Sequence, residues 1–175
     1  MTAELPAPSD LLCALMGQCV TGTLTNLAYT LAGVHRDKRR HPHRAEQLRL
    51  RRVALIAEID AWTMRSLPSP AVGARPNPNT LGQTVDRIAA VAARAFDLLM
   101  TDDPSGDRLH AQWTRLAELE VAYGDLVRDL RDGRRYLPTA RLYGIIRQKG
   151  VSVGLQHDEC RYENAIGPFH DEPRG

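Results

Sequence analysis

The sequence lacks the features by which several protein classes are identified. No uninterrupted apolar run approaches the roughly 18 residues that a membrane-spanning helix needs. The N-terminal residues do not combine a basic stretch with an apolar one, so we expect no secretory signal peptide and no membrane association. There is no Gly-x-Ser-x-Gly motif, no P-loop and no dinucleotide-binding fingerprint. The sequence therefore identifies neither a cofactor nor a substrate.

Cysteines and aromatic residues are scarce, and the charge is nearly balanced. The three cysteines, Cys13, Cys19 and Cys160, are odd in number and irregularly spaced, which is not typical of a disulfide framework. Cys13 and Cys19 lie among apolar residues, so we expect reduced, buried thiols and a cytoplasmic protein. The formal net charge of +2 is too small for the total to indicate a nucleic-acid partner.

Helix-favouring residues are abundant, and their apolar members recur at helical spacing. Four amphipathic segments follow one another, although Gly22 favours a break in the first. We expect helices at about residues 9–39, 42–67, 79–100 and 107–132, with Asn79 or Thr80 as the N-cap of the third. Each segment has a single apolar stripe, and an antiparallel bundle is the simplest way to bury all four.

The sequence thus predicts an all-α protein. Residues 1–138 would form an antiparallel four-helix bundle, and residues 139–175 would add a short extra helix and an irregular tail. No segment is convincingly predicted to be a strand, because none of the four shows alternation.

Four short blocks resemble a bacterial family known as domain of unknown function 4254, over roughly residues 25–138. They are Ile59-Asp60, NPNTLGQTVDRIA from Asn77, HAQWTRLAELEVAYGDL from His110, and GRRYLP from Gly133. Where family members carry Asn-x-Glu-Thr-x-Gly, this sequence has Asn79 at the Glu position. The resemblance implies an all-helical domain, and it implies no activity.

Asp86 is the most unusual charged residue of the predicted core. Gly82, Ala89, Ala90 and Ala93 surround it at helical spacing, and small residues allow another helix to approach closely. A carboxylate on such a face is nearly buried, and an unpaired buried charge costs several kcal/mol. We therefore predict that Asp86 pairs with an Arg or His of another helix.

Each predicted helix carries one polar residue on its apolar stripe, and bundle-core sites are built from such inward polar groups. With the Arg next to Asp86, these residues form a candidate catalytic site: His35, Asp60, Asp86, Arg87 and Glu120. The Glu-x-x-His signature of carboxylate-bridged metal sites is missing, so we predict no metal ligands. A second interpretation is that these charges only tie the helices together.

The segment between residues 36 and 52 is strongly basic. Its candidate anion-binding residues are Arg39, Arg40, Arg44, Arg51 and Arg52. Such a cluster can neutralise phosphates. However, no aromatic residues interleave and no recognition-helix pattern follows, and arginines on a helix commonly form a solvated face.

Taken together, these patterns favour a binding or assembly protein whose partner is itself or another protein. Tyr143, Ile145 and Ile146 would suit an added contact surface. Two alternatives remain open: an enzyme with a carboxylate and histidine site inside the bundle, with or without a metal, and a nucleic-acid or phosphate binder acting through residues 36–52.

Overall fold

The computed structural model describes residues 4–18, 20–101 and 106–138 of the chain. Its α-helices are α1 (Pro8–Leu15), α2 (Thr23–Arg40), α3 (Ala45–Ser66), α4 (Leu81–Thr101) and α5 (Asp107–Arg131), and a short 3-10 turn (Pro42–Arg44) precedes α3. The predicted all-α fold is confirmed. None of the helices in the described ranges is both long and apolar enough to span a membrane. The predicted extra helix and tail, residues 139–175, lie outside the described residues.

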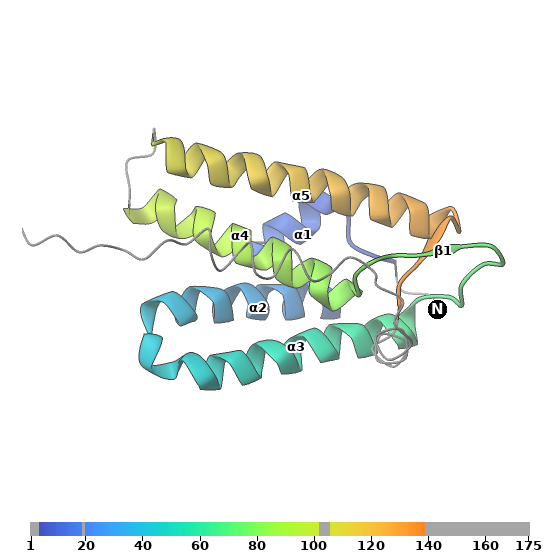
Figure 1. Cartoon of the computed structure of the whole chain (residues 1–175), viewed down its shortest axis with the longest axis horizontal. Helices are drawn as coiled ribbons and strands as arrows, with labels where there is room; N and C mark the ends of the chain where they lie inside the picture. The colour runs from blue at the N-terminus through green and yellow to red at the C-terminus, as the bar shows by residue number, and fades with distance from the viewer. Residues whose placement is uncertain (1–3, 19, 102–105, 139–175) are drawn as a thin grey trace, which may run out of the picture. The chain divides into compact units, whose positions relative to one another are not determined.

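α2, α3, α4 and α5 run in alternating directions and form the predicted antiparallel four-helix bundle (Figure 1). α4 is the central helix, because it packs against α1, α2, α3 and α5. Its alanines explain how so many helices can approach it. Ala89, Ala92, Ala93 and Ala95 are all fully buried, and small side chains allow short distances between helix axes.

The first predicted helix is in fact two helices, α1 and α2. α1 ends where Gly17 adopts a φ of +85°, and the backbone N–H groups of Gly17 and Gln18 donate back to the carbonyls of Ala14 and Cys13. α2 begins after Gly22, which has a φ of +98°. Only glycine adopts such angles without strain. The predicted break at Gly22 is therefore confirmed, but the helix already ends one glycine earlier.

The start of α4 is held by a capping box. The Thr80 hydroxyl accepts the Gln83 backbone N–H at 3.2 Å, and the Gln83 side-chain oxygen accepts the Thr80 N–H at 3.0 Å. This reciprocal arrangement satisfies two N–H groups that have no partner within the helix. Thr80, one of the two predicted caps, is confirmed.

Two very short strands join distant loops, and the sequence did not predict them. β1 (Arg75–Pro76) precedes α4, and β2 (Arg135–Tyr136) follows α5; they pair in parallel, with Arg75 opposite Arg135. Two residues are too few to show the alternation by which a strand is recognised. The pairing ties the loop between α3 and α4 to the segment that follows α5.

Candidate functional site

Asp86 of α4 lies at the centre of a buried polar group with His35 of α2 and Arg52 of α3. His35 Nε2 is 2.9 Å from Asp86 Oδ1. Arg52 donates twice, from Nε to Oδ1 at 2.8 Å and from Nη2 to Oδ2 at 2.5 Å. We name these three residues the Asp86 centre. The prediction that Asp86 pairs with an Arg or His of another helix is confirmed, and the structure supplies both.

Hydrogen bonds within the Asp86 centre compensate for the cost of removing the Asp86 carboxylate from water. Burial raises the pKa of Asp86, but the hydrogen bonds and charges of Arg52 and His35 outweigh it and hold this pKa below the ordinary value. Asp86 is therefore ionised at neutral pH, and an ionised carboxylate only accepts hydrogen bonds. His35 must accordingly carry a hydrogen on Nε2.

Within the Asp86 centre, the Asp86 side chain is shielded from solvent, whereas the Arg52 side chain is partly exposed to it. The side chains of Asp86 and His35 are 6% and 14% exposed, whereas that of Arg52 is 39% exposed. Both Asp86 oxygens already accept hydrogen bonds. These bonds connect α4 to α2 and α3, so the geometry is that of a structural contact between three helices. Neither of two surface hollows, of about 600 and 260 Å³, is lined by a residue of the centre.

Asp60 of α3 forms a second and separate polar contact, at the start of α4. Its Oδ1 accepts the backbone N–H of Gly82 at 2.7 Å, and the Thr80 side chain also donates to it. Burial raises the pKa of Asp60, and these two donors only partly oppose the shift. Asp60 thus satisfies a free N–H group in the first turn of α4, as a capping residue would, but from another helix.

Gly82 is required by the close approach of α3 and α4. A Cβ atom added there would lie 2.5 Å from the carbonyl oxygen of Ile56 and 2.8 Å from Oδ1 of Asp60. Such distances are far below normal contact, so only glycine fits. The Asp60 contact and the absence of a side chain at position 82 therefore belong to one interface.

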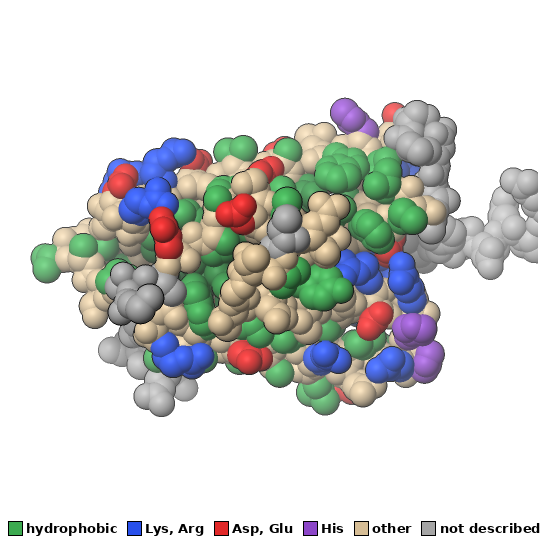
Figure 2. Space-filling view, turned by 180° about the vertical axis from the view of Figure 1, so that it is seen from behind, with side chains coloured by type: hydrophobic (Ala, Val, Ile, Leu, Met, Phe, Trp, Pro, Cys, Tyr) green, Lys and Arg blue, Asp and Glu red, His purple; other side chains and the backbone are tan. Residues whose placement is uncertain are grey.

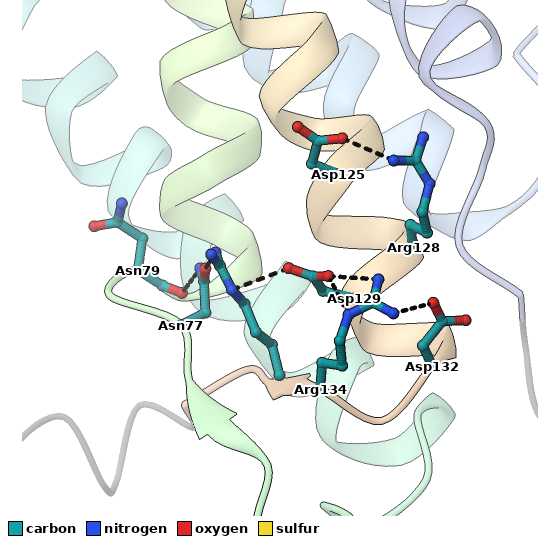
Figure 3. A network of polar contacts seen from close by, with 8 residues as sticks. Asn77, Asn79, Asp125, Arg128, Asp129, Asp132 and Arg134 are labelled. Atoms are coloured by element: carbon teal, nitrogen blue, oxygen red, sulfur yellow. Dashed lines mark hydrogen bonds and ion pairs between the residues drawn. The ribbon is translucent and has the colours of Figure 1, made fainter.

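A third polar network joins the end of α5 to the loop before α4, and Figure 3 shows it from close by. Asp129 accepts from Arg134 Nε at 2.8 Å and lies 3.1 Å from Arg135 Nε. Arg135 also reaches Asn77 Oδ1 at 3.4 Å, and Asn77 donates to the Asn79 carbonyl at 2.7 Å. Sequence reasoning missed this network. Part of the signal was present, because Asn77 and Asn79 lie in the block NPNT and Arg134 and Arg135 in the block GRRYLP, although Asp129 lies outside both.

The structure does not unite all five predicted catalytic residues. It joins His35 to Asp86, and it places Asp60 one helical turn away, against Gly82. Glu120 is half-buried on α5 and makes no hydrogen bond or ion pair with the others in the described ranges. Arg87 is half-buried on α4. Their proposed catalytic roles stay a prediction.

The five predicted anion-binding arginines are dispersed. Arg39 donates from Nε to Oδ2 of Asp97 on α4 at 2.9 Å, and Arg40 lies 3.7 Å from the other oxygen of that carboxylate. Arg52 belongs to the Asp86 centre, Arg44 donates to Gln47 at 3.2 Å, and Arg51 is exposed. The face seen in Figure 2 carries basic and acidic side chains side by side rather than a field of one sign.

Among the described residues, no group of three or more His, Cys, Asp or Glu side chains is placed to hold a metal ion.

Comparison with known proteins identifies a family and nothing closer. No curated protein and no solved structure matches the chain. The family model described as "Protein of unknown function (DUF4254)" matches residues 40–139, which is 100 of the 175 residues. The matched range contains Arg52, Asp60, Asp86 and the network of Figure 3, while His35 lies before it. Since the match covers more than half of the sequence, the chain belongs to the DUF4254 family.

Proposed function

We propose that the protein is an assembly protein that binds a second copy of itself through the outer face of α3. The observation that carries this proposal is a stripe of exposed apolar side chains on a helix whose opposite face is already buried. We call it the α3 stripe; its exposed members are Leu50, Val53, Ala54, Ala57 and Met64, and it includes the half-buried Ala61.

α3 is apolar on two faces, which is unusual for a helix at the surface of a bundle. Its inner face buries Leu48, Leu55 and Ile59. On the other side, Leu50 is 56% exposed, and Val53 and Met64 are each 53% exposed. Single exposed apolar residues are common, but a continuous stripe at helical spacing marks an interaction surface.

The α3 stripe is complementary to itself in an antiparallel arrangement. α3 has Glu46 in its first turn and Arg65 in its last. When Glu46 of one copy lies beside Arg65 of the other, Leu50 faces Ala61 and Ala54 faces Ala57. Opposite charges then meet at both ends, and the large Leu50 of each copy meets the small Ala61 of the other. A two-fold axis requires such a self-complementary surface.

The polar groups of the bundle support this proposal over the enzymatic alternative. Both oxygens of Asp86 accept from Arg52 and one also bonds to His35, while Asp60 accepts backbone and side-chain donors at the start of α4. Buried groups held by hydrogen bonds in this way stabilise the fold, and neither of the two surface hollows reaches the Asp86 centre.

Sedimentation of the full chain tests the proposal. We expect a dimer of twice the 19.5 kDa monomer at about 100 μM, a concentration that populates dimers of micromolar affinity. Leu50→Glu should weaken association at least a hundredfold, because it buries an unpaired carboxylate in an apolar interface. Val121→Glu, at a 65% exposed apolar position on α5, is the matched control and should remain dimeric.

Two outcomes contradict the proposal. One is a wild-type chain that sediments as a monomer under these conditions. The other is a Leu50→Glu variant that associates as strongly as the wild type, which would place the contact elsewhere.

A further inference from the structure

The smaller of the two surface hollows, of about 260 Å³, is formed by α2 and one residue of α3. The α2 residues of its lining include Tyr29, Gly33, Arg36 and Asp37, and α3 contributes Arg51. Pockets for drug-sized ligands have volumes of about 300–1,000 Å³, so this hollow suits a smaller molecule. None of these residues belongs to the α3 stripe or to the Asp86 centre, so the hollow is separate from the proposed self-association surface.

Gly33 leaves space in the floor of the hollow. It lies inside α2, where glycine is less favourable than alanine, and its φ is not positive. A Cβ atom added there would meet only Nη2 of Arg36, at 3.9 Å, which is an ordinary contact distance. Neither the backbone conformation nor the packing of helices therefore requires glycine at this position. The consequence of the missing side chain is a wider hollow.

The Arg36 guanidinium is held in place by its neighbours, and none of them is an acid. It lies over the rings of Tyr29 and Phe96, 5.9 Å from each centroid, and its Nη1 donates to the Leu15 carbonyl at 3.3 Å. Such contacts orient a guanidinium without neutralising it. Its Nη2 lies beside Gly33 and makes no hydrogen bond to a described residue. Arg36 thus presents an oriented donor to the hollow.

Arg51 and Asp37 supply the other two charges of the lining. Among the described residues, neither forms an ion pair, and Asp37 pairs with neither Arg36 nor Arg51 although all three line the same hollow. The lining therefore combines two guanidinium groups with one carboxylate. Asp37 would repel a doubly charged anion, whereas a molecule that carries one carboxylate and one ammonium group complements charges of both signs.

We propose that this hollow binds a small aromatic amino acid. The ligand carboxylate would accept hydrogen bonds from Arg36 and Arg51, because guanidinium groups match carboxylates in geometry. The ligand ammonium group would lie against Asp37. Tyr29 is 42% exposed, and the ligand ring would pack against the open part of this side chain.

Titration of the full chain with L-phenylalanine, followed by NMR of the backbone amides, tests the proposal. We expect saturable binding with a Kd below about 1 mM, and shifts centred on Gly33. Two further probes each lack one charged group: hydrocinnamate has no ammonium group, and phenethylamine has no carboxylate. We expect hydrocinnamate to bind about tenfold more weakly than phenylalanine and phenethylamine not to bind measurably, because the first loses Asp37 and the second loses both guanidinium groups.

Asp37→Asn separates the roles of the two kinds of charge. It should weaken the binding of phenylalanine about tenfold and strengthen that of hydrocinnamate, because it removes an attraction for one probe and a repulsion for the other. Arg51→Gln should weaken both probes. Gly33→Leu should prevent binding by filling the floor of the hollow, while its Tm stays at or above that of the wild type, because leucine favours helix more than glycine does.

The matched control is Arg49→Gln, which also removes one positive charge from α3 but at an exposed position outside the lining. It should bind phenylalanine as the wild type does. The absence of saturable phenylalanine binding would overturn the proposal. So would wild-type binding of hydrocinnamate as tight as that of phenylalanine, or a loss of affinity in the Arg49 control equal to that in the Arg51 variant. None of these outcomes bears on the dimer, which Leu50→Glu tests separately.

Discussion

At the scale of single residues, the ionisation of Asp86 makes the stability of the fold depend on pH. Its partners hold its folded pKa below the ordinary value of 3.8, so its contribution is complete above that value and is lost as the pH falls through the folded pKa. Asp86→Asn should therefore destabilise the chain most at neutral pH, and the difference from wild type should shrink toward pH 3. Asp86→Ala should cost about 3 kcal/mol at pH 7, as expected for a broken buried pair. Urea unfolding at several pH values measures both effects.

Asp60 supplies a control of opposite sign for the same experiment. Burial raises its folded pKa above 3.8, so its ionisation opposes folding. As the pH rises from 3 to 7, the wild type should lose stability relative to Asp60→Asn, whereas it gains relative to Asp86→Asn. Curves that run in the same direction for both variants would contradict the assignment of the two carboxylates.

At the scale of elements, two glycines of the bundle should respond oppositely to the same substitution. Gly82→Ala places a methyl group 2.5 Å from the Ile56 carbonyl and should destabilise the protein by about 2 kcal/mol, the cost of overpacking a helix interface. Gly33→Ala on α2 meets only the end of Arg36, at 3.9 Å, and should stabilise by about 0.5 kcal/mol through helix propensity. Denaturant unfolding measures the change in the free energy of unfolding for each variant. A change of the same sign in both would show that α3 and α4 are less closely packed than described.

The helices and the carboxylate at their centre could be predicted from sequence, because both depend on local spacing. Apolar residues three and four apart define a helix, and the small residues around Asp86 indicate a close neighbour that must supply donors. The identity of the donors could not be predicted, since Arg52 is one of many basic residues and its partner is chosen by how α3 lies on α4. The β1–β2 pairing and the Arg135–Asn77 contact depend on tertiary structure in the same way.

At the scale of the whole molecule, the buried polar contacts and the proposed self-association surface occupy different places. The Asp86 centre and the Asp60 contact both lie along the α3–α4 interface and hold the bundle together. The α3 stripe faces away from that interface. Variants of the stripe should therefore alter self-association without unfolding the chain, so the proposed binding can be measured separately from stability.

Self-association through the α3 stripe also predicts that thermal stability depends on protein concentration. If only the folded chain dimerises, mass action raises the Tm by about 2 °C for each tenfold increase in concentration. Leu50→Glu should abolish this dependence, and Val121→Glu should preserve it. Aggregation of the unfolded chain cannot imitate the result, because it lowers the apparent Tm as the concentration rises. Calorimetric scans over a hundredfold range of concentration measure the slope, and a wild-type Tm that does not change would contradict a dimer whose contacts stabilise the fold.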